Sequence, residues 1–186
     1  MTKTLQYSLG ILAVLAVLFL VNQKSQNKFE VSSDRIFTGD EEAIAKIVIK
    51  EKDQSITLVK TDSTWSIMDI DTLVMKDHQI KNFFDKVVSL EKEILISKNP
   101  EKWNKFNVDD STGKWFIFMD ASENSLGEFV IGQGQDYSRN FIRIGDKPEV
   151  YRTNTNVQYL LNTKATFWGK VPPKPAILDT LSPTTP

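Results

Sequence analysis

The chain has 186 residues, a length typical of one globular domain with short additions. Its 23 basic and 24 acidic residues give a net charge of −1 and are mixed along the length, which argues against a nucleic-acid partner. Because the chain has no cysteine, the sequence excludes disulfides, thiolate metal sites, cysteine nucleophiles and lipid attachment at a cysteine.

The most apolar segment is LQYSLGILAVLAVLFLV, from Leu5 to Val21. As a helix it would span about 26 Å, close to the roughly 30 Å hydrocarbon core of a bilayer. The alternatives are a cleaved signal peptide and a core helix of a cytosolic protein. The following sequence, LVNQKSQNKF, offers signal peptidase no pair of small residues, and its polarity fits core burial poorly. The pattern predicts an uncleaved signal anchor over residues 1–22, with the membrane as a partner.

Positive charges lie on both sides of this segment, so charge alone does not orient it. Lys3 precedes the segment, whereas Lys24, Lys28 and Arg35 follow it. The local count therefore opposes export of the C-terminal part. Long C-terminal domains nevertheless translocate largely regardless of charge, and a single N-terminal apolar segment is the usual export signal. We expect a single-pass protein of the bacterial inner membrane, with its C-terminal domain outside the cytoplasm.

Composition divides the rest of the chain into three parts. A polar stretch over residues 23–42 is predicted to be a linker, and residues 43–170 have the mixed periodicity of one folded domain. The tail over residues 171–186, VPPKPAILDTLSPTTP, is rich in proline and is expected to be disordered.

The first part of the predicted domain alternates short strands with turns. Residues 43–50, 55–60 and 64–68 are short and β-branched, which predicts an antiparallel meander. From Asp77 the period changes, and the spacing predicts a helix over residues 77–92 with Asp77 as its N-cap. Its expected buried stripe consists of Ile80, Phe83, Phe84, Val87, Val88 and Leu90.

The second part repeats this order of strands and helical turns. After a strand at residues 93–97, Asn99 and Pro100 suit the cap and first position of one or two helical turns. Further strands are predicted at residues 114–119, 127–132, 140–145 and 149–153, and a helical piece at 156–161. The sequence therefore predicts an α+β fold, with antiparallel β-sheet meanders packed with two or three helices and preceded by one transmembrane helix.

Polar residues that could carry catalysis are scattered. His78 is the one histidine, and it is expected to face water in the first turn of a helix without a nucleophile or an orienting carboxylate. Asp69 with Asp71, and Asp109 with Asp110, could pair for acid–base work or bind a hard cation, but carboxylates in turns more often serve as capping groups. We predict no catalytic, cofactor-binding or metal-binding residue and no enzyme activity.

A short glycine motif, IGQGQD, places Gly132 and Gly134 in a G-x-G arrangement. A phosphate-binding loop would need a third glycine and a following helix, whereas a strand follows here. The glycines are therefore expected to serve a turn or bulge with positive φ.

Aromatic residues cluster near lysines between residues 102 and 118. Alternation along KWFIFM sends Trp115, Ile117 and Met119 to one face of the strand and Phe116 and Phe118 to the other. Core packing is one interpretation, and an exposed aromatic face for a partner is the other. On the second interpretation the candidate interaction residues are Trp103, Phe106, Phe116 and Phe118.

Several of these elements, taken in order, resemble the bacterial membrane-anchored family named domain of unknown function 4340. An ITLVK-x-x-x-x-W strand pair ends at Trp65, and an Asp-led amphipathic helix follows. A W-x-x-F-x-V-D piece, FVIGQ, RNFIR and PEVYR complete the series. Phe106, Asn107 and Val108 stand where the family usually has tyrosine, glycine and leucine.

The resemblance implies an α+β extracytoplasmic domain without established activity, in a family often associated with ABC-type transport systems, including those linked to gliding motility. By analogy we favour a non-enzymatic accessory or scaffold protein whose partners are ABC transporter subunits or other envelope proteins. A module that binds a small ligand or an envelope polymer through the aromatic segments is the alternative, and an envelope hydrolase ranks third.

Overall fold

The computed structural model describes residues 12, 14–19, 30–134 and 137–173. Residues 12 and 14–19 are helical, and the rest of the predicted anchor lies outside the described residues, as does the predicted tail from residue 174. In the described part of the chain, no helix is both long and apolar enough to cross a membrane.

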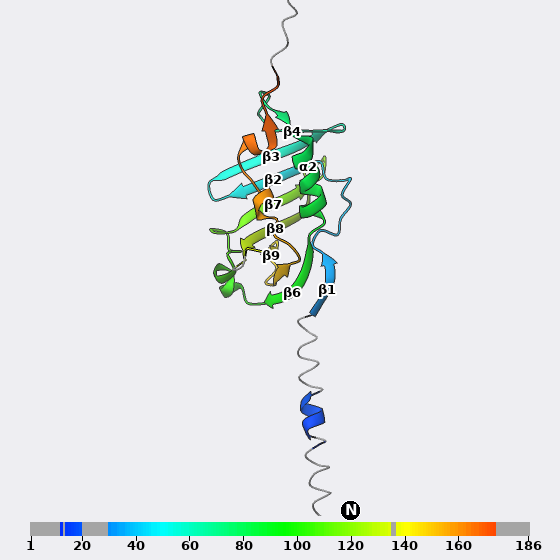
Figure 1. The fold of residues 1–186 in the computed structure, drawn as a ribbon, viewed down its shortest axis with the longest axis vertical. Helices are drawn as coiled ribbons and strands as arrows, with labels where there is room; N and C mark the ends of the chain where they lie inside the picture. The colour runs from blue at the N-terminus through cyan, green and yellow to red at the C-terminus, as the bar shows by residue number, and fades with distance from the viewer. Residues whose placement is uncertain (1–11, 13, 20–29, 135–136, 174–186) are drawn as a thin grey trace, which may run out of the picture.

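One antiparallel sheet organises the domain, and a few short helices pack on it (Figure 1). The strand order is β1-β6-β10-β9-β8-β7-β2-β3-β4, and every neighbouring pair is antiparallel. The strands are β1 (Glu30–Arg35), β2 (Lys46–Glu51), β3 (Gln54–Thr61), β4 (Thr64–Ile67), β6 (Glu91–Ser97), β7 (Lys114–Met119), β8 (Ser125–Gln133), β9 (Asn140–Ile144) and β10 (Val150–Thr153). The predicted α+β class and its antiparallel strands are confirmed.

Two regions differ from the sequence-based expectation. The stretch 23–42, predicted to be a linker, contains β1, which pairs with β6, and it buries Ile36 and Phe37 in the core. A second, two-stranded sheet joins β5 (Val74–Met75) to β11 (Gly169–Lys170), far apart in the sequence. Both pairings join segments that are far apart in the sequence. β1 is too polar, and β5 and β11 are too short, to show the alternation of apolar and polar residues that predicts a strand.

The main helix is shorter than its periodicity predicts. It begins as α2 (Asp77–Phe83) and continues as the π-helical turn η1 (Phe84–Val88). The helix ends there, and the next strand, β6, starts at Glu91. The prediction of Asp77 as N-cap is wrong: Lys76 holds the extended cap position without a side-chain hydrogen bond, and Asp77 is the first helical residue. There its carboxylate still lies at the positive end of the helix dipole.

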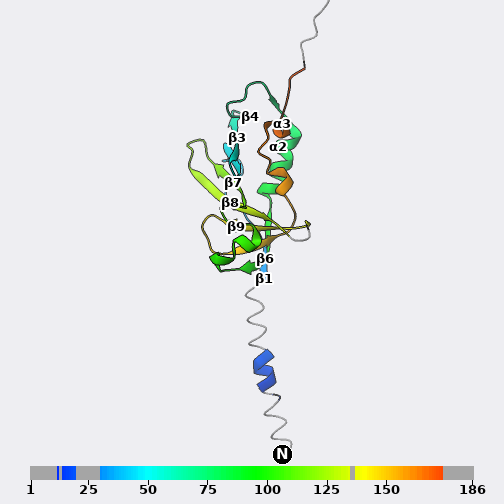
Figure 2. The ribbon, with the colours of Figure 1, turned by 90° about the vertical axis from the view of Figure 1, so that its left-hand side faces the viewer.

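Helices cover one face of the sheet, which we call the helical face. Figure 2 shows α2 and α3 (Ala165–Trp168) together on that side. The fully buried rings of Phe83, Phe118 and Trp168 meet edge to face between helix and sheet. The 3-10 turn η4 (Gln158–Leu160) adds Leu160 to the same core.

The opposite face, which we call the open face, is covered differently. A second, smaller cluster of Val108, Val130 and Val150 lies there, apart from the main core. The covering chain is residues 99–113, which contain the 3-10 turns η2 (Pro100–Lys102) and η3 (Asn104–Phe106). We call residues 99–113 the aromatic segment, because Trp103 and Phe106 pack on this cluster.

Candidate functional site on the open face

Local sequence signals shape the aromatic segment. The Asn99 side chain accepts a hydrogen bond from the Glu101 amide at 3.0 Å, and Pro100 follows at the first position, as the sequence predicts. Asn107 adopts a left-handed conformation (φ 53°), which ends the second turn. The Val108 amide then donates to the Trp103 carbonyl at 3.0 Å. The segment is therefore a compact double turn that carries two aromatic side chains.

A glycine on β8 lets this double turn approach the sheet. A Cβ at position 132 would lie 2.0 Å from the Phe106 carbonyl oxygen and 2.7 Å from that of Asn107, so only glycine fits. Gly132 is a buried residue of β8 and is not among the residues with positive φ. The predicted turn or bulge role for Gly132 is wrong, and close backbone contact takes its place.

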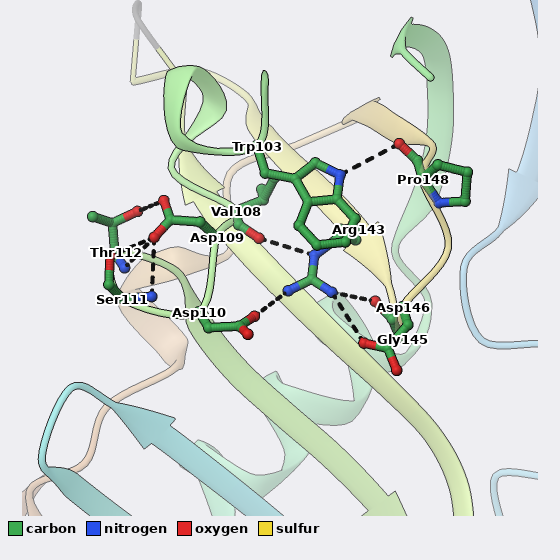
Figure 3. Close-up of polar contacts among 10 residues, drawn as sticks. All are labelled: Trp103, Val108, Asp109, Asp110, Ser111, Thr112, Arg143, Gly145, Asp146 and Pro148. Carbon is green, nitrogen blue, oxygen red and sulfur yellow. Dashed lines mark hydrogen bonds and ion pairs between the residues drawn. The ribbon is translucent and has the colours of Figure 1, made fainter. Parts of the chain in front are cut away.

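Arg143 on β9 holds the segment from beneath. Its side chain is fully buried. Nε donates to the Val108 carbonyl at 2.9 Å, and Nη2 donates to the Asp110 carboxylate at 2.7 Å (Figure 3). Nη1 donates to the Gly145 carbonyl at 2.5 Å and lies 3.6 Å from the Asp146 carboxylate. Each nitrogen of the guanidinium thus has a partner within the chain, as a buried charge requires.

Two indole rings complete the surroundings of Arg143. The guanidinium carbon lies 4.0 Å from the Trp103 ring centroid and 5.1 Å from that of Trp115. Trp103 also donates from Nε1 to the Pro148 carbonyl at 3.4 Å, which ties the segment to the turn after β9 (Figure 3). Cation–π contacts of a desolvated guanidinium are among the stronger ones. Arg143 therefore acts as a structural clamp, and its donors are already engaged.

The acidic pair divides between two roles. Asp110 pairs with Arg143, whereas the Asp109 carboxylate accepts from the amides of Ser111 (3.0 Å) and Thr112 (3.2 Å) and from both hydroxyls. Burial raises the pKa of Asp109 as the largest single effect, but the four hydrogen bonds together outweigh it and lower the pKa from 3.8 to about 2. Asp109 is thus a turn-capping carboxylate.

Asp109→Ala should lower the free energy of unfolding by about 1 kcal/mol, because two amides and two hydroxyls lose their acceptor. A carboxyl whose pKa is lowered by folding stabilises the fold above its unfolded pKa, and this stabilisation is lost as pH falls through about 2. The difference between wild type and variant in urea melts should therefore be full at pH 6 and shrink between about pH 4 and 2. Asp109→Asn, which keeps an acceptor, is the control and should cost less. A difference that is constant with pH would contradict the capping role.

The four predicted interaction residues do not lie together. Trp103 and Phe106 share the open-face cluster and are partly exposed, and Phe106 contacts Phe141 at 5.0 Å between ring centroids. Phe116 and Phe118 point to the helical face and are at most 1% exposed. The prediction of these two as interaction residues is wrong, because alternation along β7 directs them between the sheet and α2.

Other polar residues singled out by the sequence are placed apart. His78 is exposed at the start of α2, as expected, and Asp69 and Asp71 are exposed in the turn before β5. Across the described ranges, no group of three or more His, Asp or Glu side chains is placed to hold a metal ion.

Sequence reasoning missed the arginines of the open face. Arg143 occupies an alternate position in the apolar strand NFIRI, and a charge in such a place is a sign of a buried pair. Arg139 directly precedes β9, Arg152 lies on the neighbouring strand β10, and both contact Glu93.

Comparisons with known proteins support one assignment. Neither the curated proteins nor the solved structures gave a significant match. The profile of one family, described as Domain of unknown function (DUF4340), matches residues 74–170, a span from β5 to β11 that contains the helices, the aromatic segment and the Arg143 clamp. Since this match covers just over half of the chain, the protein belongs to the family of domain of unknown function 4340.

Proposed function

We propose that this protein is a non-enzymatic accessory subunit, anchored in the bacterial inner membrane, that presents the open face of its extracytoplasmic sheet to a protein partner in a transport assembly. The observation that carries the proposal is a group of partly exposed apolar side chains on the open face, beside the aromatic segment. There Val48, Val59 and Met119 are partly exposed on three adjacent strands.

Strand register brings these side chains together. Val48 pairs with Ile117 across β2 and β7, and Lys46, one pleat away, pairs with both Val59 and Met119. Residues of one face at such positions are direct or diagonal neighbours. The result is a mixed patch: Lys46 lies between Val59 and Met119 in one row, and Val48 lies in the next row. The helices pack against the other face of the sheet. Partly exposed apolar side chains on the face that the helices leave uncovered, with a cation among them, are a surface that a protein partner can bind.

Membrane anchoring is supported by the N-terminal sequence. The large apolar residues described between positions 12 and 19 are each more than half exposed, so they are not buried in the core of the domain. The membership of the family adds the expectation of a transport partner, and a shared membrane gives weak contacts a high effective concentration.

Site-specific photocrosslinking in native membranes tests this proposal. A photoreactive phenylalanine analogue at Val48 or Val59 of the full-length protein should give one adduct of the same mass from both positions. The same analogue at exposed Asn82 on α2 is the matched control and should not give that adduct. Val59→Glu should abolish the adduct formed from position 48, because it places a charge within the contact.

Two results would contradict the proposal. One is an adduct of equal yield from Asn82 and from the open face. The other is no adduct from either valine while the protein remains folded and membrane-bound.

A further inference from the structure

A cavity of about 380 Å³ lies on the open face at the other side of the aromatic segment, away from Val48 and Val59. Strands β6, β9 and β10 and the turn η3 border it. Its lining includes Ile96, Lys105, Phe106, Arg139, Phe141 and Arg152. Three of these six side chains are cations and three are apolar.

Among the residues that the structure describes, the charges of the three cations that line this cavity and of the carboxylate that two of them contact sum to a positive value. Arg152 donates from Nε to Glu93 Oε2 at 2.9 Å, and Arg139 Nε lies 3.4 Å from the same oxygen. Glu93 is thus one carboxylate shared by two guanidinium groups, and Lys105 adds a third positive charge. These four side chains carry a net charge of +2, the arithmetic being three cations less one carboxylate.

Several donors at the cavity have no hydrogen-bond partner among the described residues. Arg139 donates from Nη1 to the Asn154 carbonyl at 2.5 Å. Among the described residues, neither terminal nitrogen of Arg152 donates a hydrogen bond, and Lys105 Nζ donates none. The side chains of Arg139 and Arg152 are 39% and 38% exposed, so a ligand can reach them. This sets them apart from Arg143, whose three nitrogens each have a partner inside the protein.

The remaining wall of the cavity is mainly apolar, with Asn140 as its polar member. The rings of Phe106 and Phe141 meet at 62° between planes, and Ile96 lies across from them on β6. A planar guanidinium with free terminal nitrogens matches the oxygens of a phosphate, and a phosphate monoester carries about −1.5 to −2 charge near neutral pH. We propose that this cavity binds a phosphate monoester attached to an apolar or ring-bearing body. The site is separate from the proposed docking patch, so either proposal can fail without the other.

Binding of phenyl phosphate to the full-length protein, in nanodiscs of neutral phosphatidylcholine, tests the inference by isothermal titration calorimetry. Arg152→Gln and Lys105→Gln should each weaken binding by about tenfold, because each removes a charge-assisted hydrogen bond. Lys102→Gln is the matched control: this exposed lysine lies one turn earlier on the same segment and does not line the cavity. It should leave the affinity within about twofold, since an exposed charge at a distance is screened.

Glu93→Gln supplies a test of opposite sign. It removes the competing carboxylate and frees both Nε groups, so phenyl phosphate should bind more tightly. Benzoate, with one charge, should bind more weakly than phenyl phosphate. Addition of phosphatidic acid to the same nanodiscs distinguishes the two sources of this chemistry: competition identifies a lipid headgroup, and its absence identifies a soluble phosphate.

The inference is overturned by no detectable binding at millimolar phenyl phosphate. It is also overturned by equal affinities of wild type, Arg152→Gln and Lys105→Gln, or by weaker binding in Glu93→Gln. Thermal melting of each variant shows that any loss occurs in a folded protein.

Discussion

Phe83→Ala should lower the free energy of unfolding by about 3 to 5 kcal/mol, the cost of deleting a fully buried ring. Phe83 is 0% exposed and joins three elements, since its ring lies 6.1 Å from that of Phe118 on β7 and 5.8 Å from that of Trp168 on α3. The cavity left by the ring would be closed in by other aromatic side chains, which cannot collapse into it easily. Urea denaturation of the purified protein measures the change.

Phe84→Ala is the matched control, one residue along the same helix. Phe84 is only partly buried and packs at 5.6 Å against Trp65, which is also partly exposed. Its removal should cost less than half as much as that of Phe83, because less apolar area returns to water. If the two variants lose equal free energy of unfolding, the boundary between the buried and the partly exposed side of the helix does not run between Phe83 and Phe84.

Most strands of this fold can be predicted from the sequence, whereas pairings between strands that are far apart in the chain cannot. The segments that became β2, β3, β4 and β7 to β10 alternate with period 2 and are bounded by turn residues, so each is recognisable locally. The polar EVSSDR of β1 carries no such alternation, and its partner β6 is far along the chain. The predicted helix runs beyond the observed end at Val88 for a related reason. Leu90 continues the helical apolar spacing, but it is buried in the core just after the helix ends.

The candidate site divides in the same way between local and non-local features. The Asn99 cap follows from adjacent residues and is confirmed, and Trp103 and Phe106, three residues apart, lie in the same cluster. The contacts of Arg143 with Val108 and Asp110 cross more than thirty residues of sequence, so no local pattern announces them. For Phe116 the alternation was correct, but a sheet has two faces and the sequence does not say which one the helices cover.

Arg143→Ala should lower the free energy of unfolding by about 3 to 5 kcal/mol, because it truncates a large, fully buried side chain and leaves carbonyl acceptors without their donor. The Val108 and Gly145 carbonyls would lose their donors, and Asp110 would lose its ion pair. Trp103 and Trp115 would also lose the cation between them. The aromatic segment should loosen while the main core on the helical face persists, because the two clusters lie on opposite faces of the sheet.

Two measurements separate a clamp from general core packing. Arg143→Met keeps much of the volume without the charge, and it should cost less than alanine but still leave the Val108 carbonyl without its donor. The indole N–H resonance of Trp103, which reports the hydrogen bond to Pro148, should shift in both variants, whereas that of Trp168 on α3 should not. If Arg143→Ala costs under about 1 kcal/mol and leaves the Trp103 resonance in place, then the close contact at Gly132 and the valine cluster suffice to hold the segment. In that case the cost of desolvating the guanidinium would cancel the gain from its contacts, and Arg143 would contribute little net stability.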